Sequence, residues 1–142
     1  MPPPEARPQP PQFVVFWVIW FAILSGLFML QLFAAGGLPS GKDQGDEPLV
    51  YHLIALGAAI AAAFIRFGVI PRIAALEKKL PLMIVGLALA EGIGIVGMFV
   101  VPSQYGATKL AMLIVSVICV ILQAPVYAKP SGSGNPFVGG SP

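Results

Sequence analysis

Apolar residues gather into four long stretches along the chain, separated by short polar or proline-containing segments. The stretches cover residues 13–35, 49–70, 82–101 and 110–124, and none of them contains a proline. A hydrocarbon core about 30 Å thick needs roughly 20 helical residues to span it. The first and third stretches reach that length with Glu91 as their only charged residue. The pattern therefore predicts transmembrane helices in both places.

The second and fourth stretches each need a basic residue at the membrane boundary. Arg66 lies near the end of the second stretch, where its guanidinium can extend to the lipid headgroups. The fourth reaches spanning length when Lys109 is added at one end and Val126 and Tyr127 at the other. Strands of a membrane barrel would alternate apolar and polar residues, and runs such as 13–24 do not. We therefore expect an all-α membrane protein with four transmembrane helices in an antiparallel bundle, at 13–35, 49–70, 82–101 and 109–127.

The composition agrees with a membrane protein. Of the 142 residues, 57% are hydrophobic and 10% are charged, whereas soluble domains carry about 25% charged residues. Segment 1–12 is rich in proline and segment 128–142 in Gly, Ser and Pro, so both are expected to be disordered tails. A cleaved signal peptide ending near residue 35 is the competing interpretation of the first helix. Its apolar run is, however, longer than the roughly 7–15 residues typical of a signal peptide.

Basic residues are unequally divided between the two sides that four helices create. Lys42 and Lys109 fall on the side of the first loop. The other side, with both tails and the loop between the second and third helices, holds Arg7, Arg66, Arg72, Lys78, Lys79 and Lys129. Because Lys and Arg accumulate in cytoplasmic loops, we expect a multi-pass protein of the bacterial inner membrane with both termini in the cytoplasm. The residues expected to contact anionic lipid headgroups there are Arg66, Arg72, Lys78 and Lys79.

Glu91 lies in the middle of the third predicted helix, near the bilayer midplane. A charge at that depth costs about 3 kcal/mol on insertion scales and more than about 10 kcal/mol in simulations. The carboxyl is therefore expected to be neutral, or to face the interior of the helix bundle with hydrogen-bond partners. Depth along the helices places Ser25 and Ser116 near its level as candidate partners, with Gln31 and Gln123 farther toward the two ends.

Small residues surround Glu91 in the third helix. Gly86, Ala90 and Gly94 recur at four-residue spacing, the pattern that allows helices to approach closely in lipid. The second helix offers a similar strip at Ala55, Ala59 and Ala63. We therefore predict close packing of the second and third helices, with the carboxyl beside their contact.

The stretch 84–99, Ile-Val-Gly-Leu-Ala-Leu-Ala-Glu-Gly-Ile-Gly-Ile-Val-Gly-Met-Phe, resembles the carboxylate-bearing helix of the proteolipid (c) subunits of rotary ATP synthases. In that family a Glu preceded by Ala carries the translocated ion, so the resemblance implies this role for Glu91 alone. Over its whole length the chain resembles a loose set of small, uncharacterised bacterial four-helix membrane proteins, on Trp17, Arg66, Ala88 to Glu91, Gly97 and Pro125. This second resemblance implies the topology and an inner-membrane location, and no activity.

Other chemically active residues are few. His52 is the single histidine, so one chain cannot supply two axial histidines to a haem, and an interfacial position is favoured. Cys119 is the single cysteine and is expected to be an inert apolar side chain. The residues expected to form a solvated connection, without the spacing of a calcium loop, are Asp43, Asp46 and Glu47.

The sequence contains no nucleophile paired with a base, no phosphate-binding glycine loop and no cluster of metal ligands. We therefore expect neither an enzyme nor a cofactor, and the net charge of +2 does not indicate nucleic acid. The favoured function is that of a small polytopic inner-membrane protein acting as a non-catalytic structural or accessory component. Its expected partners are the lipid bilayer and a second copy or another membrane protein. The alternative is a proton- or ion-handling protein that uses Glu91.

Overall fold

The computed structural model describes residues 12–128. Within this range the chain forms no strands, and its four main helices are α1 (Gln12–Met29), α2 (Leu49–Ala63), α3 (Leu76–Ile95) and α4 (Gly106–Leu122). The predicted all-helical fold with four helices is confirmed. The expected disordered tails lie outside the described residues, except for Gln12, which begins α1, and Ala128, which is buried.

Three of the helices continue into wider or tighter turns. The π-helical segments η1 (Leu30–Ala34), η2 (Phe64–Val69) and η4 (Val96–Val100) extend α1, α2 and α3, and a 3₁₀ turn, η3 (Ile70–Arg72), follows η2. The continuous helices Gln12–Ala34, Leu49–Arg72 and Leu76–Val100 have 23, 24 and 25 residues and are long and apolar enough to cross a membrane. α4 has 17 residues and is shorter than such a span.

The third and fourth helices have bounds that differ from the predicted ones, and each difference involves a proline. α3 begins at Leu76, before the expected residue 82, and contains Pro81. Pro81 removes one backbone hydrogen bond close to the polar start of the helix, where the loss is tolerated better than in the middle. α4 ends at Leu122 instead of residue 127, because Pro125 has no N–H and disfavours helical geometry in the preceding residue.

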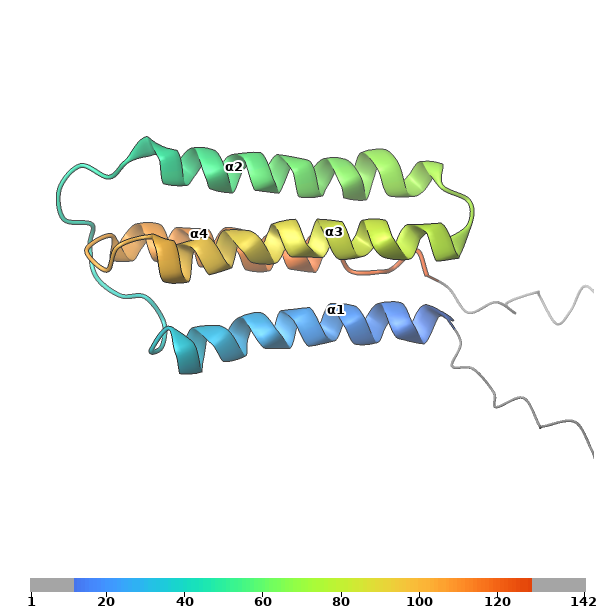
Figure 1. Ribbon diagram of the computed structural model, residues 1–142, viewed down its shortest axis with the longest axis horizontal. Helices are drawn as coiled ribbons and strands as arrows, with labels where there is room; N and C mark the ends of the chain where they lie inside the picture. The colour runs from blue at the N-terminus through green and yellow to red at the C-terminus, as the bar shows by residue number, and fades with distance from the viewer. Residues whose placement is uncertain (1–11, 129–142) are drawn as a thin grey trace, which may run out of the picture.

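α3 and α4 lie at the centre of the molecule, with α2 along one side and α1 along the other (Figure 1). In the spanning part of α3 44% of the residues are buried, compared with 11% in α1 and in α2. The outer helices therefore leave most of their apolar surface open, as expected for helices that face lipid.

Glycines of α3 allow α4 to approach closely. A Cβ atom on Gly94 would lie 2.9 Å from Oγ of Ser116 and 2.8 Å from Cδ1 of Leu27 in α1. A Cβ atom on Gly97 would lie 2.9 Å from Cβ of Met112. Side chains of α4 thus occupy the space that the missing Cβ atoms leave.

α2 packs against α3, as the sequence predicts. The glycines of the α3 small-residue strip, however, face α4 and α1 and not α2. Gly86 lies against Gln123 of α4, where an added Cβ would be 2.9 Å from Nε2. α2 joins the core through Ala55 and Ala62, which are buried. Ala59 is only partly buried and Ala63 is exposed. Matching small-residue spacing cannot identify the partner, because it does not specify which larger side chains fill the gaps.

Replacing Gly94 by Ala tests the α3–α4 contact. The added methyl group collides with Ser116 and Leu27, and such overpacking costs about 1–3 kcal/mol. We expect Gly94→Ala to have a free energy of unfolding lower than that of Gly92→Ala by that amount, measured by reversible unfolding in detergent micelles. The control is Gly92→Ala, where no atom lies within 4 Å of the new Cβ and helix propensity rises by up to about 1 kcal/mol. Equal effects of the two substitutions would contradict the packing described.

Candidate functional site

Glu91 remains near the middle of its helix in the structure. The apolar part of α3 begins at Leu80, after Lys78 and Lys79, and its continuation η4 ends at Val100. Glu91 therefore lies close to halfway along the apolar length. Its neighbours at helical spacing on the same side are Leu87 and Gly94.

The side of α3 that carries Glu91 is turned toward α1. Leu87 packs in a cluster with Phe16 of α1, and Leu27 of α1 lies against Gly94. Glu91 itself is partly exposed, at the edge of this contact. The carboxyl is thus beside the packed interior and is not enclosed by it.

Neither expected serine pairs with Glu91. Ser116 is fully buried, and its Oγ donates a hydrogen bond to the carbonyl oxygen of Ala90 at 2.7 Å. Ser25 is partly buried in α1 and makes no hydrogen bond to Glu91. Within residues 12–128 the Glu91 carboxyl has no hydrogen-bond or salt-bridge partner. The structure therefore gives Ser116 a role in joining α4 to α3 and leaves Glu91 without a partner from its own chain.

We call the end of the molecule formed by residues 66–79 and 123–128 the basic end. Here side chains bind carbonyl groups at and just after the end of α4. Nε of Arg66 donates to the oxygen of Leu122 at 2.9 Å, and Nη2 donates to that of Ala124 at 3.2 Å. The guanidinium also lies 4.8 Å from the ring centre of Tyr127. Because the carbonyls at a helix end have no partner within the helix, Arg66 supplies what the shortened α4 lacks.

Two further side chains tie the same end together. Nε1 of Trp20 donates to the oxygen of Val120 at 2.8 Å, which links α1 to α4. Nε2 of Gln123 donates to the oxygen of Ala62 at 2.8 Å, which links α4 to α2. Sequence reasoning missed these roles, because a helix continuing to residue 127 would have satisfied its own carbonyls.

The other basic residues predicted at headgroup level have different surroundings. Arg72 and Lys78 are exposed. Lys79 is partly buried, with its Nζ 5.4 Å from the ring centre of Tyr127. Contact of these residues with lipid stays a prediction.

The opposite end, here the acidic end, consists of the loop 36–48 and the connection 101–105. Oδ1 of Asp43 accepts hydrogen bonds from the N–H groups of Ala107 at 2.8 Å and Thr108 at 3.3 Å. Oδ2 of Asp43 accepts one from Oγ1 of Thr108 at 2.8 Å. A carboxylate at a helix N-terminus satisfies free N–H groups and interacts favourably with the helix dipole. Asp43 therefore fastens the first loop to the start of α4.

Glu47 and His52 extend this network. Glu47 also contacts the hydroxyl of Thr108, and its Oε1 lies 2.8 Å from Nε2 of His52. Tyr105 donates from its hydroxyl to the carbonyl oxygen of Asp46 at 3.2 Å. The loop expected to be a solvated connection is thus partly docked onto α4 and α2, through pairings that lie far apart in the sequence.

The other candidates show no arrangement for chemistry. No group of three or more His, Cys, Asp or Glu side chains in the described part of the chain could hold a metal ion. Cys119 is unpaired and partly buried in α4. The sites that the structure offers are therefore the Glu91 carboxyl and the polar contacts at the two ends.

Replacing Arg66 tests its role at the end of α4. Loss of a hydrogen bond from a charged group costs about 1.5 kcal/mol or more, so we expect Arg66→Gln to lower the free energy of unfolding by about that amount. Arg72→Gln removes the same charge from an exposed neighbour and should leave stability unchanged. If both variants lose the same stability in a denaturation series, charge near the basic end matters and the carbonyl contacts do not.

The Asp43 carboxyl makes the stability of the acidic end depend on pH. Partial desolvation raises its pKa, but hydrogen bonds from the hydroxyl and N–H of Thr108 and from the N–H of Ala107 together hold the pKa below its ordinary value. The stability contribution is therefore present above the ordinary pKa of an aspartate and disappears as the pH falls through the lowered value.

We expect Asp43→Asn to lower the thermal unfolding temperature at neutral pH and to have less effect as the solution becomes strongly acidic. The matched control is Asp46→Asn, because Asp46 is exposed and contributes its backbone carbonyl to the contact with Tyr105. A difference between Asp43→Asn and the parent that does not change with pH would argue against this role of the carboxylate.

Comparisons of the chain with protein-family models, with curated proteins and with solved structures found no match. A function is therefore inferred from the Glu91 carboxyl and from the polar contacts at the basic and acidic ends.

Proposed function

We propose that the protein is a multi-pass component of a bacterial inner membrane that acts as a structural or accessory subunit without catalysis. Its four helices then form an antiparallel bundle, with α4 and the segment that follows it completing the fourth crossing. Both termini lie at the cytoplasmic side. The distribution of charge supports this orientation, since Arg66, Arg72, Lys78 and Lys79 lie at the basic end and basic residues accumulate on the cytoplasmic side.

The observation that carries the subunit role is the unpartnered carboxyl of Glu91. It lies mid-helix on a central helix, partly exposed, and no side chain of the described chain binds it. Even on insertion scales a charge at this depth costs about 3 kcal/mol, and interhelical hydrogen bonds in lipid contribute roughly 1–2 kcal/mol in model peptides. A polar group on another membrane segment, from a second copy or another membrane protein, reduces that cost. Glu91 is thus the contact point of an interface.

The same observation supports a second function, in which Glu91 binds and releases a proton or a cation. The resemblance of residues 84–99 to the proteolipid carboxylate helix favours it. A proton pathway needs further polar groups bonded to the carboxyl. Of the predicted partners, Ser116 donates its hydroxyl proton to Ala90 and Ser25 makes no hydrogen bond to Glu91. The subunit role is therefore the better supported of the two.

Photocrosslinking from a residue within α3 tests whether a partner contacts Glu91. A photoreactive residue at the exposed position Ala88, one turn from Glu91, should give a discrete adduct with the partner. We expect Glu91→Leu to reduce this adduct at least tenfold, and Glu91→Gln, which keeps hydrogen bonding, to retain it. Glu77→Gln, at an exposed carboxylate of the same helix, serves as the control and should change nothing. An adduct that Glu91→Leu leaves at full yield would contradict the proposal.

Proton flux into vesicles separates the second function. Under the subunit role, vesicles containing the parent protein and those containing Glu91→Gln should have the same proton permeability. If the parent supports proton flux and Glu91→Gln abolishes it, the function is proton transfer and the subunit role is wrong.

A further inference from the structure

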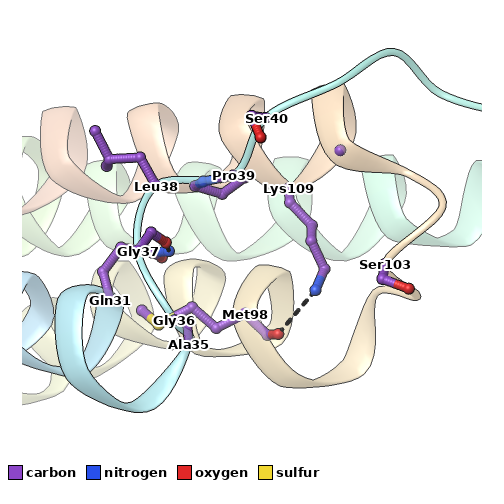
Figure 2. Close-up of a pocket in the computed structure, with 11 residues that line it drawn as sticks. Gln31, Ala35, Gly36, Gly37, Leu38, Pro39, Ser40, Met98, Ser103 and Lys109 are labelled. Carbon is purple, nitrogen blue, oxygen red and sulfur yellow. Dashed lines mark hydrogen bonds between the residues drawn. The ribbon is translucent and has the colours of Figure 1, made fainter.

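A polar cavity of about 180 Å³ opens at the acidic end of the molecule, apart from Glu91. Gln31 of η1 forms one wall and the turn 35–40 forms a second. Met98 of η4, Ser103 and the start of α4 form the rest (Figure 2). Two larger hollows, one beside Ala55 and Val115 and one beside Phe13 and Phe21, expose almost only apolar surface. The cavity at the acidic end therefore differs from these two hollows in its chemistry.

Lys109 supplies a positive charge to the cavity. Its side chain crosses the cavity, and its ammonium donates one hydrogen bond to the carbonyl oxygen of Met98 at 3.1 Å (Figure 2). An ammonium group has three donors, so two remain. No Asp or Glu lines the cavity, and no carboxylate of the described chain forms a salt bridge with Lys109. The charge is thus available to an anion.

The nearby carboxylates are engaged elsewhere. Asp43 binds the N–H groups of Ala107 and Thr108, and Glu47 pairs with His52. Neither carboxylate is among the residues around the cavity. Asp43 and Glu47 therefore do not neutralise the positive charge of Lys109 in the cavity.

Gln31 contributes the second polar group. Its side chain is 2% exposed, and its Nε2 donates to the carbonyl oxygen of Gly37. Its Oε1 is buried and has no hydrogen-bond partner among residues 12–128. A buried carbonyl oxygen without a partner is costly, so this atom requires a donor. A ligand that fits the cavity therefore combines an anionic oxygen for Lys109 with an O–H group for Gln31.

The turn around the cavity supports such a ligand. Gly36 and Gly37 have φ angles of 80° and 106°, values that side chains other than glycine rarely adopt. They turn the chain back over the end of α1, which brings Ser40 to the rim. Ser103 lies across the cavity from them (Figure 2). Ser40 and Ser103 thus add two hydroxyl groups to the lining of the cavity.

We propose that this cavity binds a phosphate group that carries or adjoins a hydroxyl. Lys109 binds a phosphate oxygen, and the hydroxyl donates to Oε1 of Gln31. Two sources share this chemistry. One is a hydroxylated phospholipid headgroup such as that of phosphatidylglycerol, which lies at the level of the helix ends, and the other is free hydrogen phosphate.

Native mass spectrometry of the full chain in a neutral detergent tests the proposal. We expect the parent to retain one phosphatidylglycerol and to bind phosphatidylcholine, which has no hydroxyl in its headgroup, at least tenfold more weakly. Lys109→Gln and Gln31→Leu should each weaken the retention at least tenfold. Lys42→Gln removes the same charge from an exposed residue of the neighbouring loop and should retain the lipid.

Titration with inorganic phosphate at constant ionic strength identifies the source. If phosphate alone binds the parent and Lys42→Gln but not Lys109→Gln, while the lipid does not bind, the ligand is the free anion. If Gln31→Leu does not fold, the comparison of ligand binding by Lys109→Gln with that by Lys42→Gln tests the proposal. The proposal is wrong if neither probe binds the parent, or if Lys109→Gln and Lys42→Gln bind both probes equally.

Discussion

The close approach of α3 and α4 is the contact on which the rest of the structure depends. Gly94 and Gly97 leave room for Ser116 and Met112, and the backbone distance this creates lets Ser116 reach the carbonyl of Ala90. In lipid, where no hydrophobic driving force joins two apolar helices, such packing and the interhelical hydrogen bonds are what hold them together. α1 and α2 pack against this pair from opposite sides. Trp20 joins α1 to α4, and Arg66, in the continuation of α2, joins that helix to α4.

The same contact determines the position of Glu91. Because the glycine side of α3 is used by α4, the carboxyl one step around the helix comes to the edge beside α1, where it is partly exposed. The polar side chains that the core does contain, including Ser116 and Gln123, are bonded to backbone carbonyls. These two side chains thus find partners within the chain, whereas the partly exposed Glu91 carboxyl finds none, which is the physical basis for proposing an interface there.

Hydropathy along the sequence was sufficient to predict four helices and to single out Glu91, because both depend on local composition. Contacts between distant segments could not be predicted in this way. The partner of the small-residue strip depends on which side chains of α4 fill the glycine gaps, and the docking of Asp43 onto Thr108 joins residues with no pattern in common. The role of Arg66 was hidden by the expected length of α4, since only a helix that ends at Leu122 needs an outside donor for its last carbonyls. The unpaired Oε1 of Gln31 likewise depends on how the turn at Gly37 folds.

The central claim is that a polar group from outside the chain covers Glu91 in the membrane. Labelling of Glu91 by an apolar carbodiimide, which reacts with protonated carboxyls in lipid, measures this cover directly when native membranes are compared with the protein dispersed as monomers in detergent. The account predicts that Glu91 is protected in native membranes and reacts once the protein is dispersed. Equal labelling of Glu91 in both preparations would show that no partner covers it, and would contradict the account.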